Sequence, residues 1–199
     1  MRYSKEHKEE TRKNIMNAAL SKFRTEGYHG IGVDGISKAA GVTSGAFYKH
    51  FDSKSAAFRG VVSEGLSILQ SAIADNQRTN GSNWVNQFMK WYFTFPDPAT
   101  KASGCGELPL EGGCALPTLS PEVARTDPET QRIFEQEISK IVEVVAAGMP
   151  KNMKGKRRVS WSVLALMVGG VVLARSVHDD KTSVEISNSV LASIRQLTR

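Results

Sequence analysis

Apolar residues recur every three or four positions along most of this chain, with polar residues between them. That spacing places the apolar side chains on one face of an α-helix, so it predicts an all-α fold. Glycine, proline or capping residues separate the apolar stripes, as expected where one helix ends and the next begins. The clearest stripes run through residues 11–26, 33–40, 44–51, 54–75, 128–147, 159–178 and 182–198.

The segment from Val33 to Phe51 predicts two short helices joined by a tight turn. Gly41 stands where the first helix must end, because glycine adopts a left-handed backbone without steric cost. The hydroxyl of Thr43 is placed to accept a hydrogen bond from the following turn, so the second helix is expected to begin at Ser44. Two helices joined around a glycine match the helix-turn-helix unit, whose second helix enters the major groove of DNA.

A denser pattern extends on both sides of this unit, over about residues 11 to 60. It comprises Ile15, Ala18, Ala19, Phe23, Gly27, Tyr28, Ile36, Ala39, Ala40, Gly41, Val42, Gly45, Phe47, Tyr48, Phe51 and Lys54. This set resembles the N-terminal domain of TetR-family transcriptional regulators. The resemblance implies a three-helix helix-turn-helix DNA-binding domain (residues 1–53) and a helical ligand-binding and dimerisation domain (residues 54–199), with about nine helices in all.

The second helix of the unit is expected to read DNA. Short side chains at its start let the helix end approach base edges, where Ser or Thr can donate or accept a hydrogen bond. Tyr48 and Lys54 are better placed for phosphates, which position a protein without reading sequence. Phe47 is either a core residue, which the pattern favours, or a contact to a thymine methyl group, whereas Phe51 is expected in the core. The candidate DNA-binding residues are Thr43, Ser44, Gly45, Phe47, Tyr48, Lys49, His50 and Lys54.

Two positions depart from the family pattern. Ile31 and Gly32 stand where hydroxyl residues are usual, so a hydroxyl that would cap the next helix and contact a phosphate is missing. Gly35, inside that helix, weakens it by about 1 kcal/mol relative to Ala. These changes reduce the affinity expected from this edge without abolishing the motif.

The net charge of +6 is concentrated near the N-terminus. Residues 1–60 contain 11 Lys and Arg against 6 Asp and Glu, whereas residues 61–199 contain 15 against 14. A basic excess beside the motif fits an approach to phosphates, although a solvated helix face would carry the same charge. Residues 1–10 are expected to form a loose charged arm, which the resemblance places along the DNA backbone.

Six of the fifteen aromatic residues fall in the twelve positions from Trp84 to Phe95. Such clusters line apolar ligand pockets, because flat rings bury much area while Tyr and Trp keep a polar handle, but they also pack ordinary cores. The resemblance favours a pocket for at least some of these rings. The candidate ligand-binding residues are Trp84, Phe88, Trp91, Tyr92, Phe95 and Cys114.

Both cysteines, Cys105 and Cys114, lie in a segment rich in Gly and Pro that runs from Pro96 to Asp127. Neither has a paired cysteine or a histidine at metal-ligand spacing, so no zinc site is predicted. Packing in a pocket wall is favoured for Cys114 over a reactive thiol, since no Lys, Arg or His lies near it in sequence to favour the thiolate. Short helices are expected near Leu108 and over residues 121–125. The GGCALPTLSPEVAR stretch also resembles one branch of the family, in which a short helix follows the cysteine.

The two C-terminal helices are the candidate dimer interface. The first is apolar on nearly every side and so needs cover all round, and Gly169 and Gly170 at its middle would let another backbone approach closely. Thr182 and Glu185 predict a capping box for the second. A second copy of the chain would complete a four-helix bundle; the alternative is that these helices only close the ligand-binding core. The candidate interface comprises residues 159–178 and 182–198.

These features predict a repressor that binds a palindromic operator as a homodimer, with half-sites about one helical turn apart, and that a small hydrophobic effector releases. The alternative is a regulator that senses oxidants or electrophiles through Cys114. An enzyme is disfavoured, and no cofactor is expected, because His7, His29, His50 and His178 show no ligand or base spacing. A cytoplasmic protein is expected, since the start lacks a signal-peptide core and the longest apolar run, Val163–Ala174, is about half a membrane span.

Overall fold

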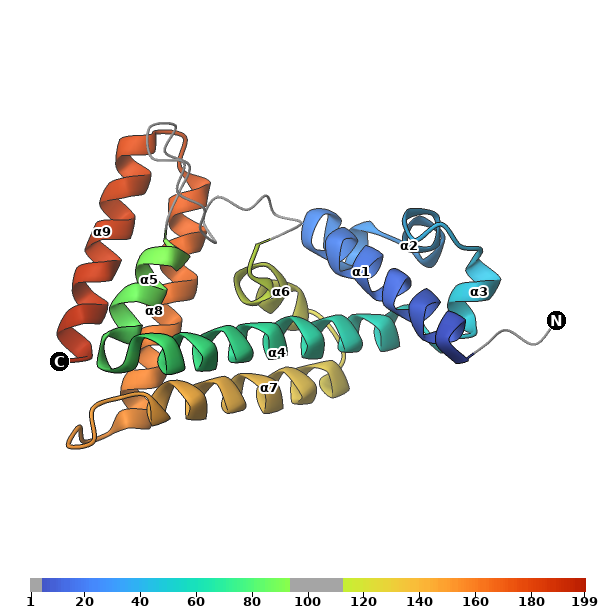
Figure 1. The fold of residues 1–199 in the computed structure, drawn as a ribbon. Coiled ribbons are helices and arrows are strands. Elements are labelled where there is room, and N and C mark those ends of the chain that lie inside the picture. Colours follow the sequence, from blue (N-terminus) through green and yellow to red (C-terminus); the bar gives the residue numbers. More distant parts are fainter. Residues whose placement is uncertain (1–4, 94–112) are drawn as a thin grey trace. The chain divides into compact units, whose positions relative to one another are not determined.

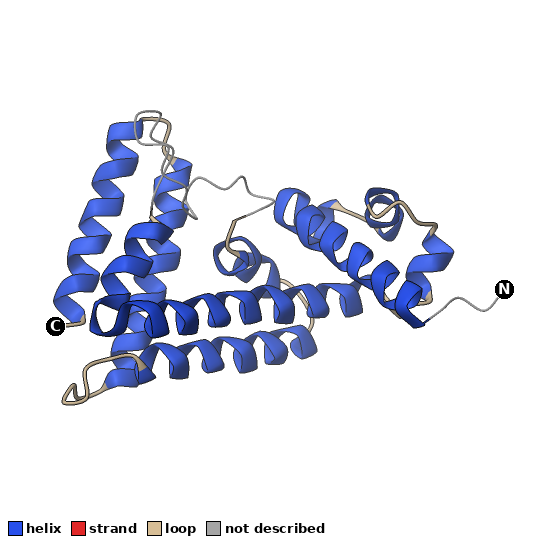
Figure 2. Ribbon diagram, viewed as in Figure 1, coloured by secondary structure: helices blue, strands red, loops and turns tan. Residues whose placement is uncertain are grey.

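The structure is a computed structural model that describes residues 5–93 and 113–199. These residues form helices and loops, with no strand among them, which confirms the all-α prediction (Figures 1 and 2). The helices are α1 (Lys5–Gly30), α2 (Val33–Ala39), α3 (Ser44–Tyr48), α4 (Lys54–Asn80), the 3-10 turn η1 (Gly81–Asn83), α5 (Trp84–Tyr92), α6 (Ala115–Val123), α7 (Pro128–Ala147), α8 (Lys156–Ser176) and α9 (Asp180–Leu197).

The described residues form two compact units. Residues 5–65 and 113–135 make up the first, and residues 66–93 and 136–199 make up the second. The long helices α4 and α7 each contribute residues to both units.

The core of the first unit is built from the apolar stripes of α1 to α4. Phe23 of α1 and Phe58 of α4 meet edge to face, with ring centres 5.0 Å apart, and the Tyr28 ring lies 4.8 Å from Phe58. Offset and edge contacts of this kind add to the burial of the rings themselves. The fully buried side chains around them are Ile15, Ala19, Ile36, Phe47, Ala57 and Val61.

Helix α1 begins earlier than predicted. Residues 5–10 are helical, and residues 6–10 are exposed. The expectation of a loose arm over residues 1–10 is therefore wrong for residues 5–10, while residues 1–4 lie outside the described ranges. Once the amphipathic part has nucleated, each added residue gains a backbone hydrogen bond, and the Thr11 hydroxyl also donates to the His7 carbonyl. The predicted break at Gly27 is confirmed by its φ of 74°.

Helix α6 packs beside α1 and α4 in the first unit. It starts directly after Cys114, as the resemblance implied, and not at residue 121. A Cβ atom on Gly65 of α4 would lie 2.5 Å from the Ala115 Cβ, so the two helices approach closely there. Glu122 of α6 accepts a hydrogen bond of 2.7 Å from the backbone N–H of Tyr28, at the break in α1. The expected helix near Leu108 lies outside the described residues.

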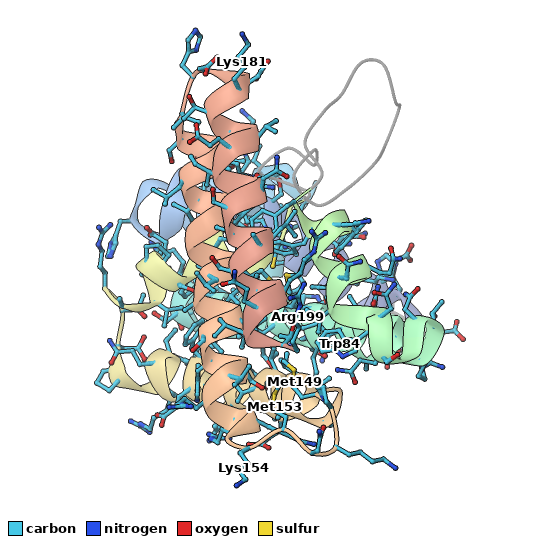
Figure 3. All side chains as sticks on the ribbon, turned by 90° about the vertical axis from the view of Figure 1, so that its left-hand side faces the viewer. Trp84, Met149, Met153, Lys154, Lys181 and Arg199 are labelled. Atoms are coloured by element: carbon cyan, nitrogen blue, oxygen red, sulfur yellow. The ribbon has the colours of Figure 1, made fainter. Side chains whose placement is uncertain are left out.

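The second unit contains α5, α8, α9 and the adjoining parts of α4 and α7. Helix α4 continues to Asn80, past the predicted break at residue 76, because its polar residues keep helical backbone until Gly81 (φ 51°). The Gln77 side-chain amide donates to the Val144 carbonyl of α7, which ties the two helix ends together. Figure 3 shows α8 and α9 lying side by side, with Lys181 near their connection and Arg199 at the other end.

Helix α9 starts differently from the prediction. Asp179 is its N-cap and accepts hydrogen bonds from the backbone N–H and the hydroxyl of Thr182, so the predicted capping box of Thr182 and Glu185 is wrong. A carboxylate three residues before the predicted start accepts a hydrogen bond from the free Thr182 N–H, and the Thr182 hydroxyl becomes a second donor to it.

Helix α8 is long and apolar enough to be compared with a membrane-spanning helix. Its 21 residues include an 18-residue window of mean hydropathy 1.6, which would allow a span by length and composition, a test that core helices of soluble proteins also pass. Its inner face is buried within the second unit, where a Cβ atom on Gly170 would lie 2.9 Å from Val190 and 3.0 Å from the Phe93 ring.

Candidate DNA-binding surface

The turn between α2 and α3 has the predicted geometry. Gly41 has a φ of 68°, and its N–H donates to the Lys38 carbonyl at 3.2 Å. The Thr43 side chain caps α3 by accepting a hydrogen bond of 3.2 Å from the Ala46 N–H. Helix α3 begins at Ser44, as the sequence predicted.

The inner face of α3 holds the helix against the core of the first unit. Phe47 is fully buried and its ring centre lies 5.5 Å from that of Phe51, which is 4% exposed. The guanidinium of Arg12 lies over the Phe51 ring at 4.8 Å. Phe47 is therefore a packing residue with no surface for a thymine methyl group, in agreement with the interpretation of it as core, and we leave it out of the candidate surface.

The outer face of α3 is polar and accessible. Thr43, Gly45, Tyr48 and Lys49 are exposed, with 55% of the Tyr48 side chain accessible, and Ser44 is half-buried. A Cβ atom added to Gly45 would meet nothing closer than 3.9 Å, so the backbone of α3 is open to close approach here. Five residues named from the sequence thus gather on one accessible face.

A groove of about 830 Å³ runs between this face and the start of α1. Its lysines are Lys8 of α1 and Lys49, the C-cap of α3. His50 also lines it and is half-buried, with a buried Nδ1 that has no hydrogen-bond partner among the described residues. Burial lowers the pKa of His50 from its ordinary value of 6.5, and the charges of Lys8, Arg12 and Lys49 lower it further. The groove is lined by His7, Lys8, Thr11, Asn14, Ala40, Gly41, Val42, Thr43, Ala46, Lys49 and His50.

Lys54 faces inward. Its ammonium donates to the backbone carbonyls of Tyr28 at 2.9 Å and Ile31 at 3.2 Å, and it lies 4.4 Å from the centre of the Tyr28 ring. The sequence assigned this residue to phosphates, whereas its observed hydrogen bonds hold the corner between α1 and α2.

The residues that depart from the family pattern, Ile31 with Gly32 and Gly35, lie together at the start of α2. Gly32 is the N-cap of α2 and makes no side-chain hydrogen bond, so the predicted loss of a capping hydroxyl is confirmed. The Ile31 side chain is 9% exposed and occupies the place where a Cβ atom on Gly35 would lie. Ile31 therefore covers the start of α2, and any larger residue at position 35 would collide with it. Nothing in the sequence pattern signals this pairing.

The aromatic residues of α5 are mostly interior. Trp84, Phe88 and Tyr92 are 1% exposed or less, and the Trp84 indole N–H donates to the Gly148 carbonyl at 2.7 Å. Trp91 is 42% exposed, Cys114 is half-buried at the N-cap of α6, and Phe95 and Cys105 lie outside the described residues.

Among the residues that the structure describes, no three His, Cys, Asp or Glu side chains are grouped as metal ligands would be.

Residues 15–61 match the family model described as "Bacterial regulatory proteins, tetR family". The chain is also similar to the HTH-type transcriptional repressor DhaR of Mycobacterium sp. strain GP1, with 32% identity over 139 residues, or 69% of this chain. The chain belongs to the TetR family. The segment aligned with DhaR spans 66% of that protein, just under two thirds, and the alignments with other curated TetR-family relatives span smaller shares.

Solved structures share the TetR fold over nearly the whole chain. The reduced form of Escherichia coli NemR has a TM-score of 0.78, with 15% identity over 96% of this chain and 98% of NemR. FadR of Bacillus subtilis, solved in complex with stearoyl-CoA, has a TM-score of 0.67, with 17% identity over 94% of this chain and 97% of FadR. At these identities the likeness establishes the fold alone. The TetR family model covers α2, α3 and the turn between them, which are the elements that carry the candidate surface.

Proposed function

We propose that this protein is a DNA-binding transcriptional regulator, a repressor that binds a palindromic operator as a homodimer and leaves it when a small hydrophobic effector binds. The observation that carries the proposal is the outer face of α3, where Thr43, Gly45, Tyr48 and Lys49 are exposed on a helix anchored from behind by Phe47. A short rigid helix with accessible polar side chains suits the major groove. Residues 1–53 would form the DNA-binding domain, and residues 54–199 the remainder.

The groove beside α3 supports contact with the DNA backbone. Lys8 and Lys49 line it from opposite sides, and exposed lysines bind phosphates by releasing condensed counterions. This part of the surface would supply affinity for any sequence, while α3 would supply selectivity.

The outer faces of α8 and α9 support a homodimer. Trp161 and Val172 of α8 and Val184 of α9 are between 40% and 52% exposed, and Gly169 has no neighbour within 4 Å of its Cβ position. Large apolar side chains exposed along two adjacent helices match an interface with a second copy, which would complete a four-helix bundle. A two-fold axis would then present two copies of α3 to a palindromic site.

The second unit would hold the effector. Its aromatic residues bury large apolar surfaces next to Trp91, and FadR, which shares the fold, was solved with stearoyl-CoA. The effector would release DNA only through a difference in its affinity for the DNA-bound and free conformations. Since DNA is the target, we place the protein in the cytoplasm.

The test is fluorescence anisotropy with the DNA upstream of the protein's own coding sequence, compared with a scrambled duplex at 150 mM salt. We expect selective binding at a dimer stoichiometry. Tyr48→Ala should weaken binding at least ten-fold with an unchanged thermal unfolding curve, because the side chain is exposed. Equal affinity for both duplexes would refute the proposal.

A further inference from the structure

One side-chain hydrogen bond crosses the helix-turn-helix unit. The hydroxyl of Ser44, the first residue of α3, lies 2.5 Å from the Oδ1 atom of Asp34 in the first turn of α2. Asp34 is exposed and Ser44 is half-buried, so the pair is at the surface. No local sequence pattern links Asp34 to Ser44, because ten residues separate them.

The direction of this hydrogen bond limits what the pair can offer to a ligand. An ionised carboxylate has no hydrogen to donate, so Ser44 must donate its single hydroxyl hydrogen to Asp34. Ser44 keeps an acceptor lone pair, and Asp34 keeps the lone pairs of Oδ2. An unpaired serine at this position could donate or accept, whereas this one, held by Asp34, only accepts.

We infer that the Asp34 and Ser44 pair determines sequence specificity, by selecting a base with an exocyclic amino group in the major groove. This rests on the proposed function and names the base chemistry that the start of α3 would read. Cytosine presents only the N4 amino donor in the major groove, and adenine presents the N6 amino donor beside the N7 acceptor. Guanine O6 and thymine O4 are acceptors and would face other acceptors here.

The carboxylate also distinguishes this pair from a neutral contact. Next to DNA it is repelled by phosphates, which lowers affinity for every sequence, while an amino group directly opposite it is attracted. Cytosine is therefore the preferred base, adenine comes second, and guanine and thymine are disfavoured by about ten-fold or more. Specificity here comes as much from rejecting wrong bases as from binding the right one.

The experiment is selection of binding sites from randomised duplex DNA with the full chain and three variants. Asp34→Asn keeps the size of the side chain but adds a donor, and Ser44→Ala removes the hydroxyl. Lys38→Gln, a change of one exposed charge on the same helix, is the matched control. Circular dichroism should show that all three variants fold, since Asp34 and Lys38 are exposed and Ser44→Ala removes only a hydroxyl group.

We expect one position in each half-site to prefer, on one fixed strand of the oriented motif, cytosine first and adenine second over guanine and thymine. Asp34→Asn should relax that position at least ten-fold toward guanine or thymine and leave the others unchanged, and Lys38→Gln should alter affinity without altering the motif. A defined motif that is the same for the wild type and Asp34→Asn would overturn this inference and leave the proposed function standing. Selection of no motif by the wild type would overturn both.

Discussion

The ammonium of Lys54 lies 4.4 Å from the centre of the Tyr28 ring and donates to the Tyr28 backbone carbonyl. The same ammonium donates to the Ile31 carbonyl, so one side chain from the start of α4 closes the corner between α1 and α2. This corner sets where α2 begins, and α2 carries α3. Lys54 therefore acts on the DNA-binding surface by positioning it.

Lys54→Met should lower the free energy of unfolding by about 1–2 kcal/mol, because two backbone carbonyls lose a charged donor while the alkyl chain over Tyr28 is kept. The salt dependence of DNA affinity should keep its slope. Lys49→Met, on the exposed face, should show the opposite behaviour, with unchanged stability and a slope smaller by about 0.9. Urea unfolding and a salt titration measure the two effects. A reduced slope with intact stability in Lys54→Met would show that this lysine contacts phosphate.

Gly41→Val should destabilise the first unit by about 1–2 kcal/mol through backbone strain alone, because φ is 68° and nothing lies within 4 Å of the Cβ position. Gly41→Asn should cost less, since asparagine tolerates the left-handed region. Gly32→Ala is the control: that site is equally open but has a φ of −97°. Chemical denaturation measures the free energy of unfolding of the three variants. An equal loss of stability in Gly32→Ala and Gly41→Val would contradict the strain argument.

Stability should depend on the protonation of His50. Because its folded-state pKa is lowered below 6.5, the unfolded chain takes up this proton first as the pH falls. The protein should therefore lose stability from about pH 6.5 downward, and the loss is complete below the folded-state pKa. His50→Gln should flatten this part of the profile. Urea unfolding midpoints at pH 7.5 and 5.5 measure the change in stability. Equal losses of stability in the wild type and in His50→Gln would show that His50 is not the source of the pH dependence.

Gly169→Glu should convert a dimer to a monomer of 21.7 kDa without unfolding the chain, because the new side chain enters open space on the outer face of α8. A charge placed in an apolar interface costs far more than the same charge in water. Light scattering after size-exclusion chromatography measures the mass. Gly170→Leu, one residue on, should instead damage the fold, since Val190 and Phe93 occupy the space that a side chain needs. An unchanged dimer in Gly169→Glu would exclude this face as the interface.

Local sequence determined most of the helix ends that carry the candidate site. Gly41 follows the end of α2, Thr43 caps α3, and Ser53 caps α4 by accepting a hydrogen bond from the Ala56 N–H. Asp127 caps α7 in the same way through the Thr130 N–H. Each of these interactions joins residues three positions apart, so a linear pattern contains both partners.

The tertiary structure decided what individual surface residues do. The sequence by itself determined that the chain is helical and that α2 and α3 form a helix-turn-helix, since both follow from the spacing of apolar residues and caps. It could not determine that Lys54 donates to Tyr28, or that Asp34 holds the Ser44 hydroxyl. Those partners lie 26 and 10 residues apart, and only the packing of whole helices brings them within hydrogen-bonding distance.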